Sequence, residues 1–190
     1  VHFMSGGIGL DRINLLDAES LDAISRKIRE FAAANPDQPW VLGRGWYYSP
    51  FPGGLPTRQQ LDALVPDRPA YMTCYDGHTG WANTAALKLA GINSGTPDPT
   101  DGVVVKDPKT GQPTGVLKEA AMGLMSKVLP QPTRADRLRA IRRASKEASR
   151  LGITSIHEAG TSDASLELFE EVRREGALNV RVYAALSVTD

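Results

Sequence analysis

The stretch Leu151-Gly-Ile-Thr-Ser-Ile-His157-Glu158-Ala-Gly160 decides how the chain is expected to fold. Gly152 predicts the end of a helix, and the apolar and β-branched residues after it predict a short buried strand. In α/β folds, binding and catalytic groups gather at the carboxyl ends of parallel strands, because the loops vary there while the sheet stays rigid. His157 and Glu158 therefore form a candidate catalytic pair, and the alternative is a hydrogen-bonded core histidine.

The segments around this stretch predict βα units. Thr133 is expected to cap a long basic helix that reaches Leu151, and a helix over 165–175 and a strand over 180–186 follow the central strand. This alternation across residues 131–190 is typical of a parallel sheet. Because two βα units can neither close a barrel nor cover both faces of an open sheet, the chain is expected to be part of a larger fold.

The first 130 residues read differently. Residues 1–9 predict the end of a buried strand, Val1 to Met4, broken by glycines. Residues 10–130 mix short strands, short helices and a hairpin, which predicts an α+β insertion between the first strand and the parallel layer. The expected strands of this segment are 13–16, 40–46 and 69–75, with hairpin arms 102–107 and 113–118. The expected helices begin after Ser20 and Thr57, span 81–89, and begin at Glu119.

Composition limits the classes of partner. The chain has 190 residues, a single cysteine and a net charge of zero, from 22 basic and 22 acidic residues. This balance gives no electrostatic reason to expect nucleic acid or an acidic membrane, and no apolar run approaches the roughly 20 residues of a membrane helix. There is no signal peptide pattern, and the lone Cys74 fits a reducing cytoplasm. The expected partner is a small molecule, and the opening without methionine predicts a piece of a longer protein.

The three histidines are the main candidates for chemistry. His2, His78 and His157 each lie where a predicted strand ends, and Asp76 and Glu158 lie beside two of them. Histidine and carboxylate side chains are the ligands of a borderline cation such as zinc. Taken singly, each histidine is more often structural, so the hypothesis of a site rests on the three together.

Two further features carry open alternatives. Glu119 stands at the start of a predicted helix, where a carboxylate is either favoured by the helix dipole or held for function. The aromatic cluster Trp46, Tyr47, Tyr48 and Phe51 is either a lid over an apolar substrate, the favoured interpretation, or a small satellite core. The sequence holds no dinucleotide or phosphate-binding loop and no nucleophilic serine elbow.

The order of these motifs resembles the amidohydrolase superfamily, in particular the insertion-bearing branch that includes N-substituted formamide deformylases. The matching segments are Val1-His-Phe3, Trp40 to Trp46, Leu55-Pro-Thr-Arg58, Asp76-Gly-His78, Ala82-Asn-Thr-Ala-Ala-Leu87, Pro113-Thr-Gly-Val-Leu117 and Gly152 to Glu158. The resemblance implies an α/β chain that forms part of a metal-dependent (β/α)₈ (TIM) barrel, with an α+β insertion after the first strand. It also implies a zinc-type centre that activates water to attack an amide or formamide-type C–N bond.

The resemblance assigns roles to single residues. His2 would be the second metal ligand of the pair and Glu119 a further or bridging carboxylate ligand. His157 would line the site or bind metal, and His78 with Trp46 would contact substrate. From their positions at strand ends, we expect His157 and Glu158 to act in catalysis and Asp76 to bind substrate. Because the first histidine of the His-x-His pair and the later barrel strands are missing, the 190-residue chain alone is expected to be inactive. Two alternatives stay open: a non-catalytic small-molecule-binding module, and an assembly unit that forms homo-oligomers through unpaired strand edges.

Overall fold

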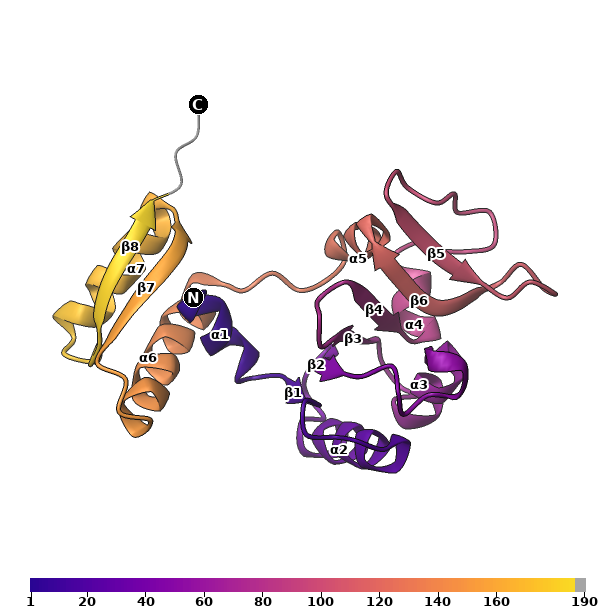
Figure 1. Cartoon of the computed structure of the whole chain (residues 1–190), viewed down its shortest axis with the longest axis horizontal. Coiled ribbons are helices and arrows are strands. Elements are labelled where there is room, and N and C mark those ends of the chain that lie inside the picture. The colour runs from indigo at the N-terminus through magenta and orange to yellow at the C-terminus, as the bar shows by residue number, and fades with distance from the viewer. Residues whose placement is uncertain (187–190) are drawn as a thin grey trace. The chain divides into compact units, whose positions relative to one another are not determined.

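The structure is a computed structural model, it describes residues 1–186, and it divides into two compact units (Figure 1). The six-stranded unit comprises residues 12–130, and the two-stranded unit comprises residues 1–11 together with the chain from Gln131 onward. The last four residues of the segment predicted as 131–190 lie outside the described residues. The prediction of a mixed α/β chain is confirmed, and each unit is described by itself.

The six-stranded unit is built on one mixed sheet in the order β1-β2-β3-β4-β6-β5. The first three strands run parallel, and the pairs β3/β4, β4/β6 and β5/β6 are antiparallel. The strands are β1 Ile13–Asn14, β2 Val41–Trp46, β3 Ala70–Cys74, β4 Thr79–Ala82, β5 Gly102–Lys106 and β6 Pro113–Glu119. The helices are α2 Leu21–Ala34, α3 Arg58–Leu64, α4 Thr84–Leu89 and α5 Gly123–Ser126, with short 3₁₀ turns at Pro52–Gly54 and Ala120–Met122.

Both faces of this sheet are buried, as the alternation of side chains along β3 shows. Met72 lies in a core cluster with residues of α2 and α3, whereas Tyr71 lies in a second cluster with residues of α4 and α5. Because neighbouring residues of a strand point to opposite faces, α2 and α3 cover one face and α4 and α5 cover the other. The predicted caps Ser20 and Thr57 are confirmed, since each side chain accepts a backbone N–H of the first helical turn.

The prediction of a helix over 81–89 is wrong at its start, because β4 occupies the first residues and α4 begins only at Thr84. Asn83 sets this boundary and is 1% exposed. Its Oδ1 accepts the backbone N–H groups of Ala70 (3.0 Å) and Ala86 (2.9 Å). Its Nδ2 donates to the carbonyls of Val65 (3.1 Å) and Arg68 (2.9 Å). One side chain therefore caps α4 and joins it to the segment that enters β3.

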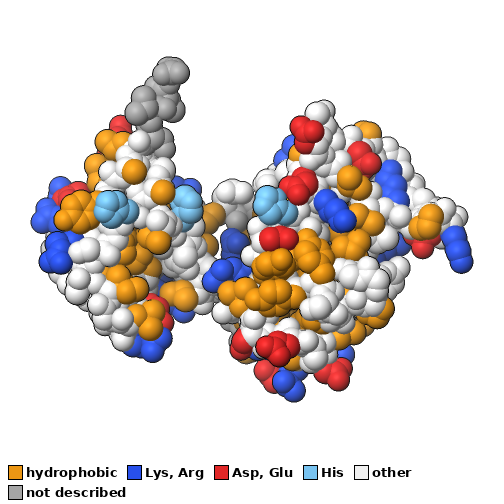
Figure 2. Space-filling view, in the orientation of Figure 1, with side chains coloured by type: hydrophobic (Ala, Val, Ile, Leu, Met, Phe, Trp, Pro, Cys, Tyr) orange, Lys and Arg blue, Asp and Glu red, His pale blue; other side chains and the backbone are white. Residues whose placement is uncertain are grey.

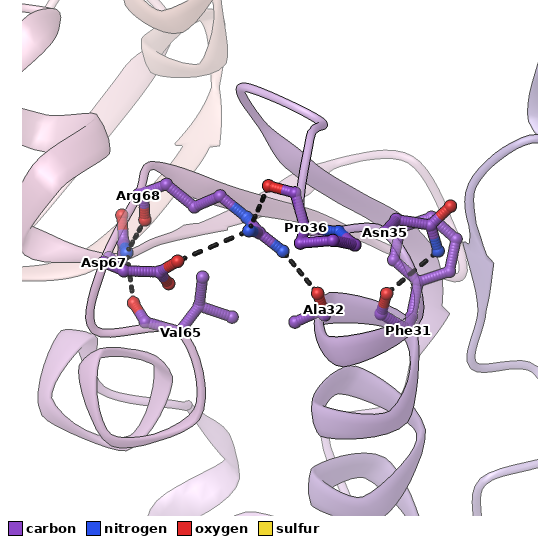
Figure 3. A network of polar contacts seen from close by, with 8 residues as sticks. Phe31, Ala32, Asn35, Pro36, Val65, Asp67 and Arg68 are labelled. Carbon is purple, nitrogen blue, oxygen red and sulfur yellow. Dashed lines mark hydrogen bonds and ion pairs between the residues drawn. The ribbon is translucent and has the colours of Figure 1, made fainter.

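The end of α2 is held by the guanidinium of Arg68 (Figure 3). Nη2 donates to the Ala32 carbonyl at 2.5 Å and Nη1 donates to the Pro36 carbonyl at 2.9 Å. The carbonyls of the last helical turn lack partners within the helix, so a partly buried cation placed there satisfies them and is favoured by the helix dipole. The amide of Asn35 adds a bond to the Phe31 carbonyl at 2.9 Å.

The two-stranded unit places helices beside a parallel strand pair. Its elements are α1 Phe3–Gly9, α6 Arg134–Arg150, β7 Ser155–Thr161, α7 Asp163–Arg174 and β8 Arg181–Leu186. The strands β7 and β8 pair in parallel, and Leu138 and Ile141 of α6 share a core cluster with Phe169 and Val172 of α7. The predicted helix–strand–helix–strand order and the Thr133 cap are confirmed.

The start of the chain is a second correction, because residues 3–9 form a helix instead of the end of a strand. Val1 makes two backbone hydrogen bonds to β7: its nitrogen donates to the His157 carbonyl and its carbonyl accepts the Ala159 N–H, both at 2.8 Å. The glycines that were expected to break a strand instead let α1 approach α6. A Cβ atom at Gly7 would lie 2.1 Å from the Ala140 carbonyl oxygen. Within the described part of the chain, every helix lacks the length or hydropathy of a bilayer-spanning segment.

Candidate functional site

The six-stranded unit carries a polar hollow where its central strands end. The residues that line it come from the loop after β2, the β3–β4 turn and the end of β6; they are Tyr48, Gly53, Gly54, Leu55, Asp76, His78, Thr79, Lys118 and Glu119. On this unit, Figure 2 shows a histidine side chain with acidic side chains beside it and a hydrophobic patch nearby. The hollow therefore brings together hydrogen-bond donors and acceptors of both charges next to an apolar surface.

The β3–β4 turn places Asp76 and His78 on this hollow. Gly77 between them has φ +82°, a left-handed conformation that glycine adopts without steric cost. Asp76 Oδ1 accepts the His78 backbone N–H at 2.9 Å, and Oδ2 accepts the Tyr48 hydroxyl at 3.2 Å. Burial raises the pKa of Asp76, but the hydrogen bonds from His78 and Tyr48 outweigh it, so the net pKa is lowered and the carboxylate form is favoured.

The imidazole of His78 lies against Glu119, which is at the end of β6. His78 Nδ1 is 2.9 Å from Glu119 Oε2, and the Glu119 N–H donates to the His78 carbonyl at 2.9 Å. The hydrogen bond and the negative charge of Glu119 raise the pKa of His78. The side chains of both residues are mainly solvent-exposed, at 65% and 57%. The structure therefore brings together Asp76, His78 and Glu119, which the sequence analysis had assigned to two different roles.

Glu119 holds this position in an unfavourable backbone conformation. Its φ is +50° and its ψ is −127°, and among the described non-glycine residues only Asp101 also has positive φ. Such conformations cost about 1–3 kcal/mol and persist where surrounding contacts impose them. Glu119 is the last residue of a strand and not, as predicted, the first residue of a helix.

Tyr48 is a site residue that the sequence analysis left within an aromatic cluster without a role of its own. Its hydroxyl is 2.7 Å from Thr79 Oγ1 as well as 3.2 Å from Asp76 Oδ2. Burial raises the pKa of Tyr48 to about 12, so the hydroxyl stays protonated. The signal available in the sequence was its position two residues after a strand that runs beside β3, because parallel neighbours end at the same edge of a sheet.

The prediction that Trp46 is part of a lid over the substrate is wrong, because Trp46 lies in the core. It is fully buried, its Nε1 donates to the Met72 carbonyl at 3.1 Å, and its ring meets Phe51 and Trp81 edge to face. The aromatic cluster divides by depth: Trp46 and Phe51 fill the core, whereas Tyr47 stacks on the exposed Tyr75 with ring centroids 4.7 Å apart. The two buried rings belong to the main core cluster of this unit, so they form neither a lid nor a separate satellite core.

The predicted pair at the end of β7 is separated by the sheet. Glu158 is buried and its Oε2 accepts the Phe3 N–H at the start of α1. His157 is exposed and stacks on Tyr183 of β8, with ring centroids 5.1 Å apart. Because adjacent strand residues point to opposite faces, Glu158 points toward α1 while His157 lies on the uncovered face.

Within its own unit, neither residue predicted to bind metal, His2 or Glu119, is part of a cluster of further ligands among the described residues. A zinc centre needs three or four ligands at one point. Among residues 1–186, no group of three or more histidine, cysteine, aspartate or glutamate side chains could hold a metal ion. His2 belongs to the two-stranded unit and Glu119 to the six-stranded unit, where the Glu119 carboxylate is bonded to His78. The donors present in these residues do not fit a complete metal centre.

Comparison with known structures defines the class of fold. The chain is similar to the crystal structure of an uncharacterized metal-dependent hydrolase from Pyrococcus horikoshii OT3, with a TM-score of 0.68 and 24% sequence identity. The similarity covers 98% of this chain and 35% of that protein. The fold of the described residues is therefore similar to part of the fold of that protein.

The sequence comparisons give the family. The model of the amidohydrolase family matches residues 1–189, so the chain belongs to this family. The chain is 32% identical to Protein LONG AFTER FAR-RED 3 of Arabidopsis thaliana, over 90% of this chain and 30% of that protein. It is 38% identical to the N-substituted formamide deformylase of Arthrobacter pascens, over 56% of this chain and 19% of that protein. The chain thus spans about a third or less of the length of these relatives.

Proposed function

We propose that this chain is part of a metal-dependent hydrolase that cleaves amide or formamide-type C–N bonds, and that its six-stranded unit supplies the substrate-binding side chains. The observation that carries the proposal is the polar hollow, together with membership of the amidohydrolase family across residues 1–189. A primary or secondary amide carries one carbonyl acceptor and one or two N–H donors. The hollow offers donors on Lys118 and Tyr48 and acceptors on Asp76 and Glu119, so its chemistry suits a neutral amide.

The architecture proposed for the whole protein is a (β/α)₈ barrel. The two-stranded unit, with its parallel strands and one uncovered sheet face, would be part of the barrel, and residues 12–130 would be the insertion after its first strand. The two relatives and the Pyrococcus structure are all about three times longer than the matched region or more, which supports a larger functional protein.

Zinc is the proposed metal, and the 190-residue chain alone is proposed to be inactive. The absence of a three-ligand cluster among residues 1–186 supports this, since the missing ligands must come from other residues. When bound, the metal would supply an activated water near neutral pH. The residues of the polar hollow would bind and orient the amide.

The experiment compares this chain with the longest reading frame that contains it. Zinc content is measured by elemental analysis, and hydrolysis is measured with a panel of N-formyl and N-acyl amines. We expect stoichiometric zinc and hydrolysis from the longer chain, and neither from the 190 residues. A longer chain that binds no metal or cleaves no amide would refute the proposed activity.

A variant of the longer chain separates substrate binding from metal binding. His78→Gln should raise KM for an amide while leaving the zinc content unchanged, because His78 lies on the hollow and outside any metal cluster of the described residues. Lys109→Gln, at an exposed hairpin turn, is the control and should change neither quantity. Loss of zinc from His78→Gln would contradict the assignment of the hollow to substrate.

A further inference from the structure

The backbone and ring of His78 are fixed at three points. The backbone N–H donates to Asp76, the backbone carbonyl accepts the Glu119 N–H, and ring Nδ1 lies 2.9 Å from the Glu119 carboxylate. A carboxylate oxygen only accepts hydrogen bonds, so Nδ1 must carry the proton in this contact. In neutral imidazole the other nitrogen, Nε2, is then an acceptor, and among the described residues it has no hydrogen-bond partner.

Stability does not account for Glu119 at this position. An ion pair between two exposed side chains contributes little to folding, whereas the positive φ of Glu119 opposes it. Glycine would adopt the same backbone conformation without steric cost. Glu119 therefore occupies a backbone conformation that glycine would adopt more easily, and from this position its carboxylate contacts the ring of His78.

We propose that Glu119 is a positioning residue that holds neutral His78 as the Nδ1–H tautomer, so that in this neutral form Nε2 accepts the N–H of a secondary amide bound in the polar hollow. Lys118 Nζ, for which no hydrogen-bond partner is found within residues 1–186, lies on the same hollow and is a donor for the amide carbonyl. This inference rests on the proposed function and narrows its substrates. Amides that keep an N–H are bound, and tertiary amides lose the contact with His78.

The first test measures the tautomer of His78 and requires neither a bound metal nor enzyme turnover. Long-range ¹H–¹⁵N correlation spectra of the 190-residue chain, at a pH where His78 is neutral, should show Nδ1 protonated and Nε2 unprotonated. In Glu119→Gly and Glu119→Gln the His78 signals should move toward the mixture of tautomers found in a free imidazole. A parent chain with His78 in the Nε2–H form, or variants with an unchanged tautomer, would overturn the proposal.

Asp101 provides the matched control, because it also has positive φ, 58°, and its neighbour Gly102 pairs with Glu119 across the β5/β6 ladder. Asp101→Gly removes a similar backbone strain without removing a partner of His78. Both glycine variants should melt at or above the temperature of the parent chain, and only Glu119→Gly should change the tautomer. A clear fall in melting temperature for Glu119→Gly would show that the Glu119 side chain contributes to stability. The tautomer of His78 in Glu119→Gln would then be the only test of the proposal by tautomer.

The second test reads ligand selection. N-methylbenzamide and N,N-dimethylbenzamide differ by the N–H that His78 is proposed to accept. By chemical-shift titration at a pH where His78 is neutral, the secondary amide should bind the parent chain roughly fivefold to tenfold more tightly, the difference expected for one hydrogen bond. This preference should disappear in Glu119→Gln and persist in Asp101→Gly. Equal affinities in the parent chain would refute the inference, whereas the proposed hydrolase activity depends on zinc content and turnover of the longer chain.

Discussion

Replacing Asn83 with alanine should destabilise the six-stranded unit more than any exposed polar substitution. The side chain makes four hydrogen bonds to backbone groups while being 1% exposed. Its removal leaves two N–H groups and two carbonyls without partners in a region that excludes water. At about 1 kcal/mol for each net hydrogen bond, the free energy of unfolding should fall by about 3–5 kcal/mol.

The assay is urea denaturation followed by tryptophan fluorescence. The three tryptophans, Trp40, Trp46 and Trp81, are all buried in the six-stranded unit, so their emission reports on that unit alone. The control is Asn93→Ala, which removes a surface amide that accepts the Gly95 N–H at 2.8 Å. Because water can replace that contact, the cost should stay below about 1 kcal/mol. Equal losses for Asn83→Ala and Asn93→Ala would refute the reasoning.

Asn83→Asp tests the same network without changing its size. A carboxylate can accept the Ala70 and Ala86 N–H groups but cannot donate to the Val65 and Arg68 carbonyls. Burial raises the pKa of the introduced carboxyl above its unfolded value of about 3.9. The loss of stability should therefore grow as the pH rises from about 4 and become constant above the folded pKa. A loss that does not depend on pH would contradict this account.

Two further predictions concern the close approach of α1 to α6 at Gly7 and the His78–Glu119 pair of the polar hollow. Gly7→Ala should destabilise the two-stranded unit by about 1–3 kcal/mol, because the new Cβ atom would collide with the Ala140 carbonyl. The control Gly6→Ala has open space around it and should be neutral or stabilising. Thermal unfolding followed by far-UV circular dichroism distinguishes the two variants. Glu119 raises the pKa of His78, so the stabilisation from their pair is fully present below about pH 6.5 and is lost as the pH rises through the raised value. NMR titration of His78 should show this raised pKa, which Glu119→Gln lowers; a parent value at or below about 6.5 would contradict the pairing.

Elements with strong local signals could be predicted from the sequence. Thr133 begins α6 as expected because its hydroxyl accepts the Asp136 N–H and the apolar positions that follow keep helical spacing. The hairpin of β5 and β6 was also recovered, since its turn residues separate two β-branched runs. In these elements the local preference and the tertiary fold agree.

Where tertiary contacts determine the type of secondary structure, the prediction from local sequence is wrong. The strand β4 was read as the first turn of a helix because Trp81 and Ala82 suit either state, and pairing with both β3 and β6 makes them a strand. Phe3 and Met4 were predicted to form a strand, but they lie in a helix and pack their partly buried side chains against the cluster formed by α6 and α7. Periodicity cannot settle either segment, because each has too few residues to show a period.

The candidate site shows the same division. The turn Asp76-Gly-His78 was found from its residue types, since a glycine between two polar residues at a strand end is a strong local signal. The contact of His78 with Glu119 joins residues far apart in the sequence and depends on the β4/β6 register. The burial of Trp46 and the separation of Glu158 from His157 likewise follow from which face of a sheet each residue occupies.

The discontinuity of the two-stranded unit has a consequence for the order of folding during synthesis. Its α1 and α6 pack together although residues 12–130 lie between them, and closing an unfolded loop of that length costs roughly 4 kcal/mol. If the six-stranded unit folds first, it replaces that flexible loop with a fixed span and removes most of this entropic cost. On the ribosome, α1 must wait for α6 to emerge, and by then the complete six-stranded unit has left the tunnel or is leaving it. Mutations that slow the folding of residues 12–130 should therefore delay the docking of α1 on α6.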